Sequence, residues 1–178
     1  IEITLEAISK INLPAFWFWP NVDAGSDGTS KGIRAYREHF PEKVKNIYFI
    51  KNMGSLDFLK LIYNSKCLIG NSSAGIRESS FLGIPVVNIG SRQNGRERST
   101  STIDISCSAE LITNTVRQCV KKNEKVNKKN IKNPYDPFLD GKNSLRVATT
   151  CINALNNFSR SKLINKKFCH LKMDHMDF

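Results

Sequence analysis

The stretch from Gly70 to Glu78, Gly-Asn-Ser-Ser-Ala-Gly-Ile-Arg-Glu, has residue types that could bind a phosphate. It lies between a predicted strand and a predicted helix. Free backbone amides at a helix N-terminus attract anions, and the hydroxyls of Ser72 and Ser73 add donors that a diphosphate can use. One to two helical turns further along, the Glu78 carboxylate could accept hydrogen bonds from both hydroxyls of a ribose. A purely structural interpretation stays open, in which Ser72 caps the helix and Glu78 faces solvent.

A second stretch, residues 89–98, carries Arg92, Arg96 and Arg98 in a loop that also contains two glycines. Arginine suits phosphate because its planar guanidinium donates two parallel hydrogen bonds. We therefore expect a flexible basic loop beside the first stretch. The alternative is a charged loop that is simply solvated.

A third stretch, Pro-Asn-Val-Asp-Ala-Gly-Ser at residues 20–26, begins where the chain leaves its first predicted strand. Asn21 is its candidate ligand-binding residue. Asparagine, aspartate and glycine are common in any tight turn, so this stretch alone is a weak indication of a site.

Short apolar runs bounded by proline, asparagine, glycine or serine predict the strands that position these stretches. Such runs are typical of parallel strands buried on both faces. The predicted strands are residues 15–19, 47–50, 67–69, 85–89 and 103–105.

Segments with helical periodicity alternate with these strands. The sequence predicts helices at residues 5–11, 31–39, 56–64, 75–82 and 109–121, and Ser144 is expected to cap a last helix with an apolar stripe. This alternation predicts an α/β fold, a Rossmann-like parallel sheet with helices on both faces. Ligands bind such sheets beyond the carboxyl ends of the strands, where the three stretches lie.

The bulk composition is that of an ordinary globular domain. At 178 residues, with 40% hydrophobic residues, the chain predicts a domain over residues 1–158 and a basic tail over residues 159–178. No apolar run approaches the roughly 20 residues that span a bilayer. The five cysteines are scattered without a Cys-x-x-Cys spacing, which favours reduced thiols, and the cysteine and histidines of residues 169–175 match no strong zinc pattern. We expect no metal and no cofactor.

The net charge of +11 is concentrated in lysine- and asparagine-rich segments, residues 121–132 and 162–172. A basic balance can indicate nucleic acid binding, but no aromatic residues interleave the first segment and no nucleic-acid motif accompanies it. Solvated lysine-rich segments are the preferred interpretation, and we expect neither nucleic acid nor a membrane as a partner.

Taken together, the motifs PNVDAGS, GNSSAGIRES and GSRQNGRER closely resemble the hydrolysing UDP-N-acetylglucosamine 2-epimerases. NPYDPFLDG, at residues 133–141, resembles a segment before the last helix of that family, although it carries extra residues. The resemblance covers about residues 5–155. The non-hydrolysing epimerases have an Asp-Ser-Gly-Gly type of loop in place of Gly-Asn-Ser-Ser.

The resemblance implies the C-terminal half of a two-domain, glycosyltransferase-B-like enzyme that binds UDP mainly in this half. It assigns Ser72 and Ser73 to the diphosphate, Glu78 to the ribose, and Arg92 and Asn21 to the walls of the site. The implied reaction removes the C2 proton of UDP-N-acetylglucosamine, expels UDP and adds water to give N-acetylmannosamine. The resemblance also implies a role in sialic acid or related sugar biosynthesis, and a full-length protein that is cytoplasmic and homo-oligomeric.

No catalytic residue is expected in this chain, because the family's acid–base groups match positions upstream of Ile1. The missing N-terminal domain is thus an implied partner, and this chain alone is expected to be inactive. Three alternatives stay open: the UDP-sugar-binding half of a glycosyltransferase of the same architecture, a basic nucleic-acid-binding module, and a fragment with no independent function. The exact UDP-sugar is left open too.

Overall fold

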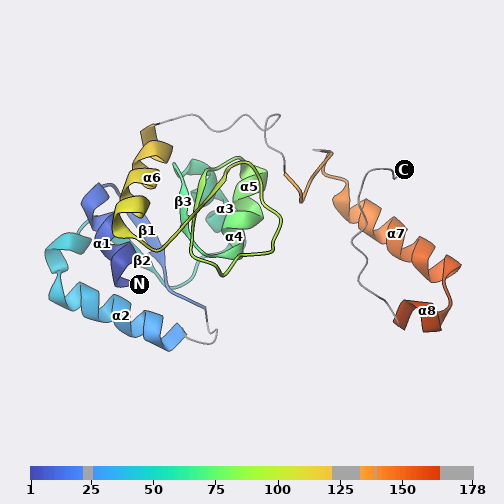
Figure 1. Ribbon diagram of the computed structural model, residues 1–178, viewed down its shortest axis with the longest axis horizontal. Coiled ribbons are helices and arrows are strands. Elements are labelled where there is room, and N and C mark those ends of the chain that lie inside the picture. The colour runs from blue at the N-terminus through green and yellow to red at the C-terminus, as the bar shows by residue number, and fades with distance from the viewer. Residues whose placement is uncertain (22–25, 122–132, 139, 165–178) are drawn as a thin grey trace. The chain divides into compact units, whose positions relative to one another are not determined.

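In the computed structural model, helices separate the first four strands along the chain (Figure 1), and the fifth strand follows the fourth without a helix between them. The structure describes residues 1–21, 26–121, 133–138 and 140–164. The elements of the first unit, Ile1–Pro137, are α1 (Glu2–Ile11), β1 (Ala15–Phe18), α2 (Ser26–His39), the 3-10 helix η1 (Pro41–Val44), β2 (Ile47–Ile50), α3 (Ser55–Asn64), β3 (Leu68–Gly70), α4 (Ser73–Ile76), α5 (Glu78–Leu82), β4 (Val86–Ile89), β5 (Thr102–Ile105) and α6 (Ala109–Lys121).

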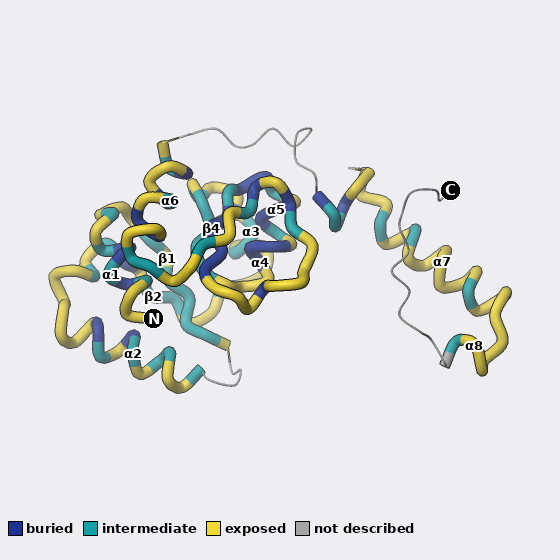
Figure 2. Tube along the Cα trace, in the orientation of Figure 1, coloured by how far each residue is buried: buried dark blue, intermediate teal, exposed yellow. Residues whose placement is uncertain are grey.

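A second unit begins at Phe138 and contains α7 (Asn143–Asn157) and α8 (Arg160–Ile164). The expected cap at Ser144 is wrong, because α7 starts at Asn143 and its N-cap is Lys142, two residues before Ser144. Within this unit the Arg146 guanidinium makes two hydrogen bonds to the Asp140 carboxylate, at 2.8 and 2.6 Å, just before the helix. The apolar side chains of α7 are exposed (Figure 2). The domain boundary expected at residue 158 stays a prediction.

All the described strands pair in parallel, in a two-stranded sheet β1–β2 and a three-stranded sheet β3–β4–β5. The predicted α/β class with parallel strands is confirmed. We expected a single sheet, but the described strands form two. Because β3 has only three residues, it offers few backbone groups that could pair with a strand on its other side. Along β4 the register places Asn88 opposite both Gly70 and Asp104.

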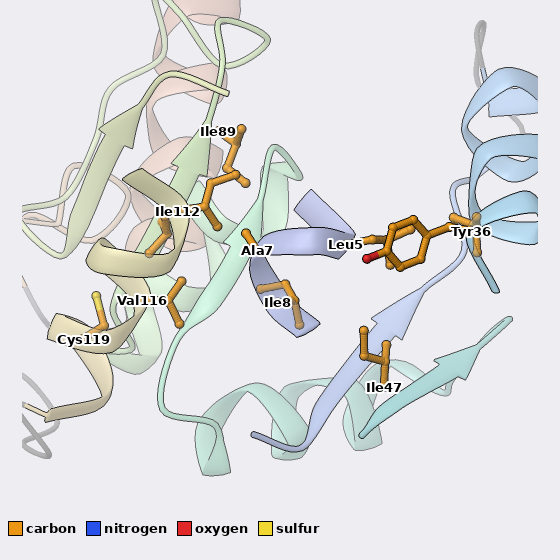
Figure 3. Close-up of a cluster of buried hydrophobic side chains, with 11 residues drawn as sticks. Leu5, Ala7, Ile8, Tyr36, Ile47, Ile89, Ile112, Val116 and Cys119 are labelled. Carbon is orange, nitrogen blue, oxygen red and sulfur yellow. The ribbon is translucent and has the colours of Figure 1, made fainter. Parts of the chain in front are cut away.

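The central strand β4 is buried along its whole length and is covered by helices on both faces. Successive side chains of a strand point to opposite faces. Val87 and Ile89 join the core formed with α1 and α6 (Figure 3), whereas Val86 packs toward Gly75 of α4. The carboxyl ends of β3 and β4 are thereby fixed side by side.

The described cysteines, Cys67, Cys107, Cys119 and Cys151, are free thiols, and burial raises the pKa of Cys67 to about 12. In the part of the chain that the structure describes, no helix has the length and hydrophobicity to cross a membrane. The lysine-rich residues 122–132 and the cysteine and histidines of the tail lie outside the described residues.

Glu6 of α1 connects three elements through its carboxylate. It accepts hydrogen bonds from Lys43 Nζ at 2.8 Å and from Tyr36 Oη at 2.7 Å, and it lies 3.3 Å from Lys10 Nζ. The hydrogen bond from Lys43, followed by that from Tyr36, lowers the pKa of Glu6 from 4.5 to about 2. A lowered folded-state pKa stabilises the protein above the unfolded-state pKa, and this stabilisation is lost as the pH falls through the folded-state pKa.

We therefore predict that Glu6→Gln lowers the melting temperature at pH 7 by about 2 °C, since partly exposed ion pairs contribute little each. The difference from the wild type should shrink between pH 4.5 and pH 2, where the Glu6 carboxylate becomes protonated. Thermal unfolding followed by circular dichroism measures both effects. Glu38→Gln, on the exposed side of α2, is the matched control, and an equal effect of both substitutions would contradict the role of Glu6.

Gly75 lets the backbone of α4 approach the sheet closely. A Cβ atom at this position would lie 2.9 Å from Val86 Cγ1 and 3.3 Å from Leu68 Cδ2, whereas a Cβ on Gly28 of α2 would have no heavy atom of the described residues within 4 Å. The same glycine-to-alanine substitution should thus have opposite effects at the two positions.

We predict that Gly75→Ala lowers the free energy of unfolding by about 1–2 kcal/mol, because overpacking outweighs the higher helix propensity of alanine. Gly28→Ala should raise it by ~0.5–1 kcal/mol, since it gains that propensity without a clash. Urea denaturation measures both values. Stabilisation by both substitutions would show that α4 does not lie this close to β3 and β4.

Candidate functional site

The loop after β3 presents two serine hydroxyls. Gly70 has a φ of +132°, which a residue with a side chain rarely adopts, and this conformation turns the chain out of the sheet. Ser72 is the N-cap of α4, and its Oγ accepts a hydrogen bond from the Ala74 amide at 3.3 Å. Ser73 is the first residue of α4. Both serines are exposed at the carboxyl end of β3, as expected.

The helix expected at residues 75–82 is interrupted. α4 has only four residues, and the chain bends at Arg77 before α5 begins at Glu78. Glu78 is therefore the first residue of a new helix and does not lie one to two turns into the first, which corrects the prediction. Its Oε2 atom is buried and accepts no hydrogen bond from the described residues. A buried carboxylate oxygen without a donor is costly, and a ligand hydroxyl could serve as that donor.

Hydrogen bonds to the Asn71 carbonyl connect the loop after β4 to the loop after β3. Gln93 Nε2 donates to the Asn71 carbonyl at 2.6 Å, and Arg92 Nη1 lies 3.5 Å from the same oxygen. Arg92 is exposed, whereas Gln93 is buried. The structure thus brings Arg92 next to the residue that precedes Ser72.

Arg98, in the loop that we expected to be flexible and basic, is held by contacts within the protein. Its Nε lies 2.7 Å from Asp104 Oδ2 in β5, and its guanidinium donates to the carbonyls of Gln93 and Arg96 at 2.7 and 2.6 Å. Three contacts of this kind fix the side chain within the loop. Of the three arginines, only Arg92 and Arg96 are exposed.

The short segment of residues 133–137 lies against the same two loops. Asn133 and Asp136 are buried, and the Asn133 side chain accepts a hydrogen bond from the Tyr135 amide at 3.0 Å. The Tyr135 hydroxyl donates to the Glu97 carbonyl at 3.3 Å, and the Arg77 guanidinium lies 6.0 Å from the tyrosine ring. This segment supports the loops, and no ligand contact was expected from it.

Asn21 is the one candidate that does not follow a strand of the β3–β4–β5 sheet. It is exposed beyond the end of β1, in the other sheet, and residues 22–25 of its motif lie outside the described part of the chain. None of the hydrogen bonds or ion pairs found among the described residues joins Asn21 to Ser72, Ser73, Glu78 or Arg92.

Two surface hollows lie elsewhere on the first unit. One is lined by residues of α1, η1 and the start of β2, and the other by residues of α2 and η1. The charges of the first hollow largely neutralise each other, because Glu6 pairs with Lys10 and Lys43. Within the described ranges, no three histidine, cysteine, aspartate or glutamate side chains are grouped so that they could hold a metal ion.

A family model described as UDP-N-acetylglucosamine 2-epimerase matches residues 1–151. The chain belongs to the UDP-N-acetylglucosamine 2-epimerase family. All five candidate site residues lie within the matched region.

Curated relatives of this epimerase-family chain are considerably longer than it is. The chain is 33% identical over 121 residues to the UDP-N,N'-diacetylbacillosamine 2-epimerase (hydrolyzing) of Legionella pneumophila, covering 68% of this chain and 31% of the relative. It is 51% identical over 53 residues to the GDP/UDP-N,N'-diacetylbacillosamine 2-epimerase (hydrolyzing) of Campylobacter jejuni, covering 30% and 14%. With the UDP-N-acetylglucosamine 2-epimerase of Neisseria meningitidis the identity is 30% over 100 residues, covering 56% and 25%. The chain spans about a third or less of each relative.

Among solved structures, the chain is similar to the UDP-GlcNAc 2-epimerase of Methanocaldococcus jannaschii, which was crystallised with UDP-GlcNAc and UDP. The TM-score is 0.45 at 18% identity, and the similarity covers 82% of this chain and 48% of that one.

Sequence reasoning missed the residues that join the loops of this epimerase-family chain. Gln93, Asn88 and Asp104 were assigned no role, although Asn88 stands in the middle of an otherwise apolar strand. Asn88 Nδ2 donates to Asp104 Oδ1 at 2.6 Å across the β4–β5 ladder. A polar residue within a buried strand needs a hydrogen-bond partner, and this requirement was the available signal.

Proposed function

We propose that the loops after β3 and β4 bind the uridine diphosphate part of a UDP-sugar, as the nucleotide-binding half of a hydrolysing UDP-N-acetylglucosamine 2-epimerase. The observation that carries the proposal is the buried Oε2 of Glu78, which accepts no hydrogen bond from the described residues and lies a few residues beyond two exposed serine hydroxyls. A carboxylate suits the two hydroxyls of a ribose, and the serines suit the phosphates. Family membership supports the same assignment.

Arg92 and the serines would also contribute to the reaction. As the bond between C1 and the phosphate oxygen breaks, negative charge grows on the departing UDP. A guanidinium and hydroxyl groups that are held in place stabilise this charge more strongly in the transition state than in the ground state. Arg92 fits this role because its guanidinium lies beside the carbonyl of Asn71, the residue before Ser72.

The proposed reaction begins with removal of the C2 proton and departure of UDP, which leaves an unsaturated sugar. Addition of water then gives N-acetylmannosamine. We assign no acid–base residue to this chain, and we propose that the rest of a two-domain protein provides these groups. The names of the Legionella and Campylobacter relatives support the hydrolysing outcome. The residues assigned here bind the uridine diphosphate. Because all UDP-sugars share this group, these residues do not select the sugar.

We predict that the chain binds UDP in preference to ADP in isothermal titration calorimetry at two salt concentrations. Ser73→Ala should weaken UDP binding roughly fivefold, as expected for the loss of about 1 kcal/mol from one hydrogen bond. Glu78→Gln should weaken it more than tenfold, because hydrogen bonds to a charged group contribute about 1.5–3 kcal/mol. Glu97→Gln, an exposed carboxylate in the neighbouring loop, is the matched control and should have no effect.

Equal affinities for UDP and ADP that fall steeply with salt would contradict the proposal. They would identify the basic surface as the source of binding, since salt screens the attraction between exposed charges.

A further inference from the structure

Gln93 is a buried polar side chain that links the two loops of the proposed site. It is 2% exposed, and its Nε2 donates to the Asn71 carbonyl at 2.6 Å. The two residues are separated by 22 positions in the sequence. Each is a direct neighbour of a proposed ligand-binding residue, because Asn71 precedes Ser72 and Gln93 follows Arg92.

Packing alone does not account for this glutamine. Its Oε1 atom is buried and accepts no hydrogen bond from the described residues. Burying an amide oxygen without a partner costs free energy, and an apolar side chain of the same length would fill the space without that cost. What glutamine provides here, and an apolar side chain such as methionine or leucine would not, is the hydrogen bond from Nε2 to the Asn71 carbonyl.

The backbone of Gln93 is itself fixed to the sheet. Arg98 donates to the Gln93 carbonyl at 2.7 Å, and the same guanidinium lies 2.7 Å from Asp104 in β5. Asp104 in turn accepts a hydrogen bond from Asn88 in the centre of β4. The Gln93 side chain therefore extends from a fixed point and determines how far the Asn71 carbonyl lies from the β4 loop.

We propose that Gln93 is a positioning residue that sets the separation between the serine hydroxyls and Arg92, so that both reach one diphosphate. This inference rests on the proposed function for its ligand. Its structural part, that Gln93 holds the loop after β3 in place, can be tested without any ligand.

The test uses Gln93→Met, which keeps the length of the side chain and removes the donor. Gln118→Met on the exposed side of α6 is the matched control. In the ligand-free protein, we would measure the hydrogen-exchange rates of the amides of Ala74, Gly75 and Arg77. These amides donate hydrogen bonds to oxygen atoms of Ser72 and Ser73. Calorimetry then compares UDP with uridine, which lacks the diphosphate.

For Gln93→Met we expect exchange of these three amides to accelerate at least tenfold, while the Ile112 amide in α6 keeps its wild-type rate. The affinity for UDP should fall about tenfold, and the affinity for uridine should change less than twofold. Gln118→Met should leave all these values unchanged.

Unchanged exchange at residues 74–77 would overturn the proposal, whatever happens to UDP binding. Faster exchange throughout the protein, or equal losses of UDP and uridine affinity, would overturn it in favour of a general role in stability. Faster local exchange with unchanged UDP affinity would overturn the link to the diphosphate. Failure of the wild type to bind UDP would instead contradict the proposed function, and exchange alone would then decide whether Gln93 holds the loop.

Discussion

The burial of β4 on both faces is the constraint on which the rest of the first unit depends. Val87 and Ile89 face the core of α1 and α6, and Val86 faces α4, so the strand cannot shift by one residue without exposing apolar side chains. Its one polar residue, Asn88, is held by Asp104 of β5. Because β4 is fixed in register with β3, the loops that leave both strands meet at the same edge of the sheet.

These loops are joined by polar contacts that run back to β4. Asn88, Asp104, Arg98 and Gln93 form a chain of contacts that ends at the carbonyl of Asn71. The proposed diphosphate site therefore does not depend on one long helix, and α4 is too short to provide a substantial dipole. Its geometry depends instead on how the two loops are tied together, which explains why buried side chains matter as much as the exposed ones.

Much of this arrangement could be predicted from the sequence because it follows from local patterns. Short apolar runs predicted the strands within one residue at each end, and the parallel pairing of β1 with β2 and of β3 with β4 follows from the helices between them. The positions of Ser72, Ser73 and Arg92 at strand ends follow from the same rule. What could not be predicted depends on contacts between distant residues. Nothing local distinguishes Arg98, which is fixed by Asp104, from the exposed Arg92, and the bend at Arg77 lies within a segment of uniform helical periodicity.

Amide chemical shifts of the protein, followed while UDP is added, show directly whether the ligand binds at the loops after β3 and β4. On titration of the 178-residue chain with UDP, we expect shifts concentrated at residues 70–78 and 90–93. The competing location is the hollow between α1 and η1, which is lined by Lys10, Lys43 and Lys45. Shifts that cluster around those lysines and leave Ser72, Ser73 and Glu78 unchanged would contradict the account.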